Sequence, residues 1–306
     1  MSGDPRARAA SWSLVASSSL FALMAVLTKV VTRGIPGAEA AVVRFATGAV
    51  VVAGLWVGKH IDLRPRRWGW LFARGFFGGT AVLAYFSAMQ RIPVGEATLL
   101  NYTQPVFTML GAWLMLGERP PRRALVALPL TLFGVSLIVG IRVSELHASA
   151  GELMGLGSAV LSGGAVTAVR ASRRQVPGGP AAETAWSVFA SFTFVGLAVT
   201  LPTVVPPLGH WVAPTARQWA LLLGIGLTST VAQLLLTEAL QHLQVDRAGI
   251  ISQLTAAFAI GGGAIFLGER LSPGFVAGAL ITLAGVAFVT LRGPTRLLEK
   301  RRVERL

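Results

Sequence analysis

Continuous apolar stretches recur along the whole chain, and each is about 20 residues long, enough to cross a hydrocarbon core of about 30 Å as a helix. Their apolar residues do not alternate with polar ones, which excludes a transmembrane barrel. Only 13% of the residues are charged, whereas a soluble globular domain carries about 25%. The sequence therefore predicts an all-α polytopic membrane protein.

The apolar stretches predict ten transmembrane helices, and the short connections between them leave no room for a soluble domain. The predicted spans are 11–32, 38–57, 68–89, 94–116, 121–141, 151–171, 183–205, 217–240, 247–267 and 273–292. The first stretch is too long for the apolar region of a usual signal peptide, so we expect an uncleaved span. The chain has no cysteine, which excludes disulfides and thiolate metal sites.

The net charge of +14 is distributed unevenly across the predicted membrane. With ten spans both termini lie on the same side, and that side carries 19 of the 27 Lys and Arg residues. Positive residues resist translocation, so we expect both termini to be cytoplasmic in an inner or plasma membrane. The basic tail, 293–306, and the basic loops are expected to contact anionic lipid headgroups, and no nucleic-acid partner is expected.

The sequence contains a long internal repeat. Residues 67–140 align with 218–291 without a gap at an offset of 151, and 19 of the 74 positions are identical. Upstream, Glu39 and Phe45 correspond to Glu183 and Phe189 at an offset of 144. The expected organisation is a short cytoplasmic N-terminus (1–10), a first five-helix repeat (11–141) and a second (151–292) before the tail.

Five spans is an odd number, so the second repeat must enter the membrane from the opposite side. The sequence thus predicts inverted-topology repeats. This arrangement is typical of secondary transporters, in which the substrate site lies near the membrane midplane between the repeats.

The tetrapeptide LGER occurs in both repeats, at 116–119 and 267–270. Gly117 and Gly268 fall where a helix ends, a position that favours glycine in a left-handed cap. Glu118 and Glu269 precede the next helix, where a carboxylate can accept hydrogen bonds from exposed N–H groups. We therefore interpret the motif as structural rather than catalytic.

These features resemble the drug/metabolite transporter superfamily, and more narrowly its EamA-type ten-helix transporters. The resemblance lies in the two five-helix halves, the LGE that ends the fourth helix of each half, the proline-bearing fourth span and the pair Arg44-Phe45 in span two. It implies a central cavity lined by spans one to four and six to nine, with spans five and ten outside. It leaves the substrate open.

Polar residues on one face of a membrane helix mark either a wet cavity or hydrogen bonds between helices. Spans four, eight and nine carry such stripes, and two of them occupy matching repeat positions. The candidate substrate-binding residues are Tyr85, Asn101, Tyr102, Gln104, Gln233, Thr237, Ser252, Gln253 and Thr255. The tyrosines are included because a buried tyrosine offers a flat face and a hydroxyl to a planar or cationic solute.

Charged residues inside spans have separate interpretations. Arg44 is a candidate gate or anion contact, and pairing with a carboxylate is the alternative. Arg74 is expected to reach the interface by snorkelling. Glu238 is the deepest carboxylate of the predicted spans and a candidate for proton coupling, provided that burial raises its pKa.

The motif GFVAG at 274–278 allows close helix approach. It is compatible with packing within the chain, which we favour, and with a homodimer through span ten.

Other classes of function find less support. No HExxH or GxSxG motif is present, so no enzyme is predicted, and neither a metal nor a cofactor is expected. Nothing resembles the filter of a channel. We expect a secondary transporter that moves a small polar metabolite, such as an amino acid, by alternating access, with export favoured. An importer of a nucleoside- or cofactor-like solute is the first alternative, and a non-transporting scaffold or receptor is the second.

Overall fold

The structure is a computed structural model that describes residues 5–118, 124–139, 148–174, 180–242 and 251–290. The first half contains α1 (Pro5–Val31), α2 (Gly37–Val57), α3 (Trp68–Arg91), α4 (Val94–Asn101), α5 (Gln104–Leu116) and α6 (Ala124–Val139). The second half contains α7 (Ala150–Arg173), α8 (Ala185–Thr200) with a 3-10 turn η1 (Leu201–Val204), α9 (Ala216–His242), α11 (Leu254–Leu267) and α12 (Pro273–Thr290).

Six of these helices are long and apolar enough to cross a membrane: α1, α2, α3, α7, α9, and α8 together with η1. They coincide with the predicted spans one to three and six to eight. Shorter apolar helices lie within α6, α11 and α12. The predicted all-helical membrane fold is therefore confirmed.

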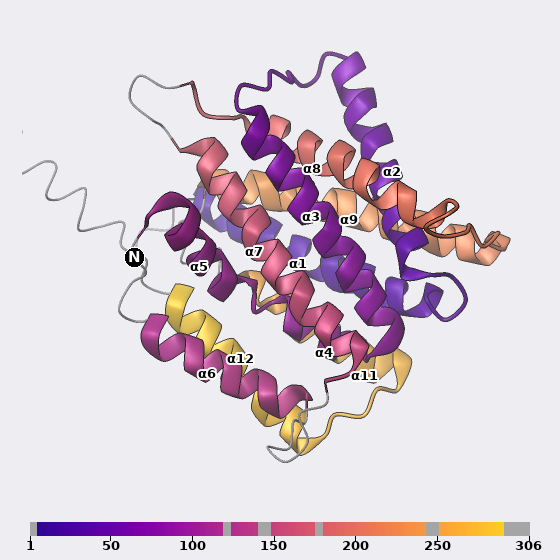
Figure 1. Ribbon diagram of the computed structural model, residues 1–306, viewed down its shortest axis with the longest axis vertical. Coiled ribbons are helices and arrows are strands. Elements are labelled where there is room, and N and C mark those ends of the chain that lie inside the picture. Colours follow the sequence, from indigo (N-terminus) through magenta and orange to yellow (C-terminus); the bar gives the residue numbers. More distant parts are fainter. Residues whose placement is uncertain (1–4, 119–123, 140–147, 175–179, 243–250, 291–306) are drawn as a thin grey trace, which may run out of the picture.

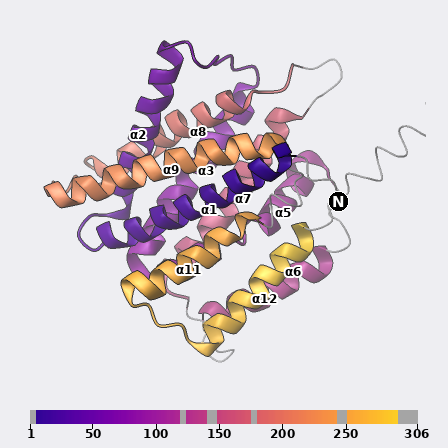
Figure 2. The same cartoon turned by 180° about the vertical axis from the view of Figure 1, so that it is seen from behind.

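The packing of the helices follows the internal repeat. In the repeat, α3 corresponds to α9 and α7 corresponds to α1. Helix α3 makes its most extensive contacts with α7, and α9 likewise makes its most extensive contacts with α1. In the same way, α3 packs on α8 while α9 packs on α2, and α5 packs on α7 while α11 packs on α1. Each half therefore buries its helices mainly against the other half, as two interlocked inverted repeats do (Figures 1 and 2).

Helices α6 and α12 lie side by side at the edge of the bundle (Figures 1 and 2). They pack closely, because a Cβ added to Gly278 would lie only 2.6 Å from the backbone oxygen of Gly134. Gly278 is the second glycine of GFVAG. Its close packing partner is thus within the same chain, as favoured from the sequence.

The fourth span is not the continuous helix predicted over 94–116. It consists of α4 and α5, separated at Tyr102 and Thr103. Pro105 explains the break, because it has no N–H and its ring excludes a helical carbonyl four residues earlier. The Thr103 hydroxyl donates to the backbone oxygen of Leu100 at 2.7 Å, which satisfies a carbonyl at the end of α4.

The ninth span is interrupted at the matching position. Residues 251–252 are helical, Gln253 is in a turn, and α11 begins at Leu254. Gln253 corresponds to Tyr102 in the repeat, yet the position of Pro105 is occupied by Ala256. The break is therefore a property of both halves and does not depend on proline alone.

The two LGER motifs end α5 and α11 as predicted. Gly117 and Gly268 have φ values of 67° and 69°, in the left-handed region that favours glycine. The predicted role of Glu269 was wrong in one respect, because it does not cap the helix that follows it. Ser272 caps α12 by accepting from the Phe275 N–H at 3.1 Å.

Glu269 instead caps a helix of the other half. Its carboxylate accepts from the N–H groups of Val94, at 2.7 Å, and Gly95, at 3.3 Å, at the start of α4. Glu118 forms an ion pair with Arg170 of α7 at 2.7 Å, and the segment that follows it lies outside the described residues.

Two further carboxylates join the halves in a crossed arrangement. Glu39 at the start of α2 accepts from the N–H of Val212, before α9, at 2.7 Å. Glu183, just before α8, accepts from the N–H groups of Arg66 and Arg67, before α3, both at 2.5 Å. Each repeat thus fixes the approach to the third helix of the other.

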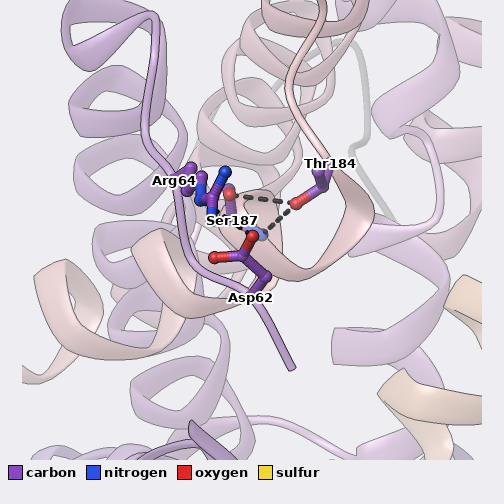
Figure 3. Close-up of polar contacts among 4 residues, drawn as sticks. All are labelled: Asp62, Arg64, Thr184 and Ser187. Carbon is purple, nitrogen blue, oxygen red and sulfur yellow. Dashed lines mark hydrogen bonds and ion pairs between the residues drawn. The ribbon is translucent and has the colours of Figure 1, made fainter. Parts of the chain in front are cut away.

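The loop before α3 lies next to the start of α8 (Figure 3). It carries the ion pair between Asp62 and Arg64, at 2.9 Å. Thr184 is the N-cap of α8 and accepts from the Ser187 N–H at 3.0 Å.

Candidate functional site

A cavity of about 220 Å³ lies between the two halves. Among the described helices, all except α6 and α12 contribute to its wall, in agreement with the expectation that spans five and ten lie outside. The lining residues are Phe21, Met24, Arg44, Arg74, Gly78, Ala81, Val82, Tyr85, Phe86, Asn101, Tyr102, Gln104, Ser162, Ala165, Val166, Phe192, Gln233, Leu236 and Thr255.

The two helix breaks supply several of the neutral polar residues of the wall. Asn101, Tyr102 and Gln104 line the cavity from the break between α4 and α5, and Thr255 does so from the start of α11. The polar stripes of the sequence and the interrupted helices therefore meet at one place.

Two of the candidate residues are held by neighbouring helices. The Asn101 amide donates to the hydroxyls of Ser158, at 2.9 Å, and Ser162, at 3.3 Å, on α7. The hydroxyl of Tyr85 is 2.7 Å from that of Thr98 on α4. Tyr85 lines the cavity, and its hydroxyl is already bound within the bundle.

Arg44 lies in the wall with only 7% of its surface exposed. Its guanidinium carbon is 5.0 Å from the ring centre of Phe45 and 5.3 Å from that of Phe192 on α8. Both Nε and Nη1 are buried without a hydrogen-bond partner among the described residues. Neither ion pair among the described residues includes Arg44, so they do not support the alternative that Arg44 pairs with a carboxylate.

Arg74 was expected to snorkel to the interface, and this expectation was wrong. Its side chain lines the cavity, with the guanidinium carbon 4.0 Å from the ring centre of Phe192. Gly78, one turn further along α3, leaves the space that this side chain occupies, because a Cβ there would lie 2.3 Å from Arg74 Nη1. The ring of Phe192 offers a cation–π contact that the sequence pattern gave no means of finding.

Gln233 of α9 lines the cavity, but four other candidates do not belong to its wall. Thr237 donates to the backbone oxygen of Gln233 at 2.7 Å, within α9. Ser252 and Gln253 belong to the break before α11 without lining the cavity, and the Gln253 Oε1 is buried without a hydrogen-bond partner among the described residues. Glu238, the candidate for proton coupling, is exposed and does not line the cavity.

The sequence reasoning did not identify Ser162 of α7 or Phe192 of α8 as lining residues. Ser162 carried a weak signal as a small polar residue inside an apolar span. Phe192 carried none, because an aromatic residue in a membrane helix usually faces lipid or the core.

Comparison with known proteins is consistent with this architecture. A model of the EamA-like transporter family matches residues 8–140 and again 149–291. The pseudopaline exporter CntI of Pseudomonas aeruginosa is 30% identical over 275 residues, which cover 89% of this chain and 93% of that protein. Human solute carrier family 35 member G1 is 29% identical over 238 residues, covering 72% of this chain and 62% of that protein.

A solved crystal structure has the same fold. It superposes with a TM-score of 0.60 and covers 99% of this chain and 100% of its own, at 20% sequence identity.

Proposed function

The chain belongs to the EamA-like transporter family, and we propose that it exports a small polar metabolite by alternating access through the cavity between its two halves. The observation that carries this proposal is the position of the cavity. It lies between two interlocked inverted repeats, and the helix break of each repeat contributes polar residues to its wall.

The way in which the halves are joined supports alternating access. The helices of each repeat pack mainly on the other repeat, so rocking one repeat against the other changes the cavity wall on both sides. The crossed carboxylates Glu39 and Glu183 lie at helix starts in the two halves and hold the segments before α9 and α3. Because their contacts cross between the halves, they are placed to rearrange when the halves move.

Export is favoured as the direction by the relative with 30% identity, which is an exporter. Import of a nucleoside- or cofactor-like solute is the second candidate, and the presence of Tyr85 and Tyr102 in the cavity wall supports it, because an aromatic ring can stack on a planar solute. We place both termini in the cytoplasm and the chain in the inner or plasma membrane, because the basic residues concentrate on that side.

Small-molecule profiling of cells and medium tests the proposed direction and class. Cells that express the wild-type chain are compared with cells that express Tyr102→Ala at equal membrane abundance. We expect one or a few small polar metabolites to rise in the medium and fall in the cytosol with the wild type only. The reverse change would favour the importer, and no difference at any abundance would favour a non-transporting scaffold.

A further inference from the structure

We infer that the cavity binds a small organic anion with two negative charges, such as a dicarboxylate, whose acidic groups contact Arg44 and Arg74. This inference rests on the proposed function, since it names the substrate class of the same cavity. It goes beyond that function because a small polar metabolite could equally be neutral or cationic.

The first observation is the absence of a counter-charge in the part of the chain that the structure describes. Arg44 and Arg74 both line the cavity and both lie against Phe192, so two positive charges share one small space. No described carboxylate lines the cavity, and neither described ion pair includes these arginines. Buried charges without a partner are costly, so the site is set up for an opposite charge from outside.

The second observation is the unused hydrogen-bonding capacity of the arginines. The Nε and Nη1 of Arg44 and the Nε of Arg74 have no partner among the described residues. A guanidinium presents its N–H groups in a planar fork that matches a carboxylate. The contact of both guanidinium groups with the ring of Phe192 supplies no hydrogen-bond acceptor for these donors.

The third observation comes from the internal repeat. Arg74 corresponds to Ile225 at the offset of 151, and Arg44 corresponds to Val188 at the offset of 144. Ile225 and Val188 are both buried apolar residues. Because the other half forms the corresponding helices with apolar residues, helix formation alone does not explain an arginine at either position.

The size and remaining polarity of the cavity limit the anion. A volume of about 220 Å³ equals that of about seven water molecules. This admits a small organic acid. Asn101 and Gln104, at the break between α4 and α5, are neutral polar residues of the same wall.

A charge series tests the inference without requiring transport. Succinate, succinamate and succinamide have nearly the same shape but two, one and no negative charges at neutral pH. We expect succinate to raise the melting temperature of the detergent-purified chain at matched ionic strength. Succinamate should bind with at least tenfold lower apparent affinity, and succinamide should not change the melting temperature. Tenfold is about the factor that one charge-assisted hydrogen bond contributes.

Variants of the two arginines connect the effect to the cavity. In Arg44→Gln and in Arg74→Gln we expect the apparent affinity for succinate, obtained from the shift in melting temperature, to fall at least tenfold. In the double variant we expect succinate to cause no shift. The melting temperature without ligand should stay the same or rise, because an unpaired buried charge is removed. Arg91→Gln is the matched control, since Arg91 is an exposed arginine of the same helix, and it should keep the full succinate shift.

The inference is overturned if no dicarboxylate from malonate to adipate gives a charge-dependent shift, or if the shift persists in the double variant. It is also overturned if both single variants fold less stably without ligand, which would indicate a structural role. Exchange of labelled succinate in proteoliposomes separates this result from the proposed function. Binding of succinate without exchange would support the anion site and contradict transport. Exchange of a neutral solute without anion binding would support transport and contradict the anion site.

Discussion

The carboxylate of Glu269, at the end of α11 in the second half, accepts a hydrogen bond from the N–H of Val94, the first residue of α4 in the first half. Gly263 leaves the space for it, because a Cβ at this position would lie 2.4 Å from Glu269 Oε2. The duplicated LGER motif therefore does more than end a helix. In the second half it positions the broken helix that forms part of the cavity wall.

Replacing Glu269 with glutamine should destabilise the chain. The amide oxygen can keep one hydrogen bond to α4, but the favourable interaction of a negative charge with the helix N-terminus is lost. We expect a loss of about 1 kcal/mol in the free energy of unfolding, measured by reversible denaturation in mixed micelles. Glu118→Gln is the matched control, because it removes only a partly exposed ion pair with Arg170 and should cost less. A smaller loss for Glu269→Gln than for Glu118→Gln would contradict this role.

Replacing Gly79 with alanine should weaken the contact between α3 and α8. A Cβ at Gly79 would lie 2.7 Å from the Cα of Gly196, so one backbone would have to move. We expect a destabilisation of about 1–3 kcal/mol by the same measurement. The control is Gly157→Ala on α7, where a Cβ meets nothing within 4 Å and alanine should stabilise the helix by up to about 1 kcal/mol. Equal effects at the two positions would argue against close packing.

Removing the hydroxyl and removing the ring of Tyr85 should have different effects. Tyr85→Phe loses the hydrogen bond to Thr98 and should cost about 0.5–1.5 kcal/mol of stability while transport is retained. Tyr85→Ala removes the flat face from the cavity wall and should reduce transport strongly. A transport defect in Tyr85→Phe, at equal abundance, would show that the hydroxyl rather than the ring contacts the solute.

The orientation in the membrane can be tested with reporter fusions. Green fluorescent protein fused after Leu306 should fluoresce, because the C-terminus is expected in the cytoplasm. Alkaline phosphatase inserted at Leu208, between η1 and α9, should be active, because that segment is expected on the opposite side. The opposite pair of results would reverse the orientation without changing the fold.

The spans and the repeat could be predicted from the sequence. The length of each apolar stretch indicates a span on its own, and the gapless repeat indicates the same spans a second time. The break at Tyr102 was only partly visible, since Pro105 signals it in span four but Ala256 occupies the matching position in span nine. The partner of Glu269 could not be predicted, because Val94 lies 175 residues away and only tertiary packing brings it close.

The site was accessible to sequence reasoning where polarity was unusual for its surroundings. Asn101 and Gln104 are polar groups in an apolar helix, which is a direct signal of a wet or hydrogen-bonded face. Arg74 was placed incorrectly because its distance from the helix end allows its side chain to reach either the membrane interface or the interior of the bundle. Only the space left by Gly78 and the ring of Phe192 decides that it turns into the cavity.

Access to the cavity from the two sides of the membrane tests the central claim most directly. The chain has no cysteine, so Ser162→Cys places a single thiol on the cavity wall. Its labelling by a membrane-impermeant maleimide is measured in vesicles of each orientation. Alternating access requires that this one position be labelled from either side, at rates that change in opposite directions when a solute is transported. Labelling from one side only, under all conditions, would contradict alternating access and favour a receptor with a one-sided pocket.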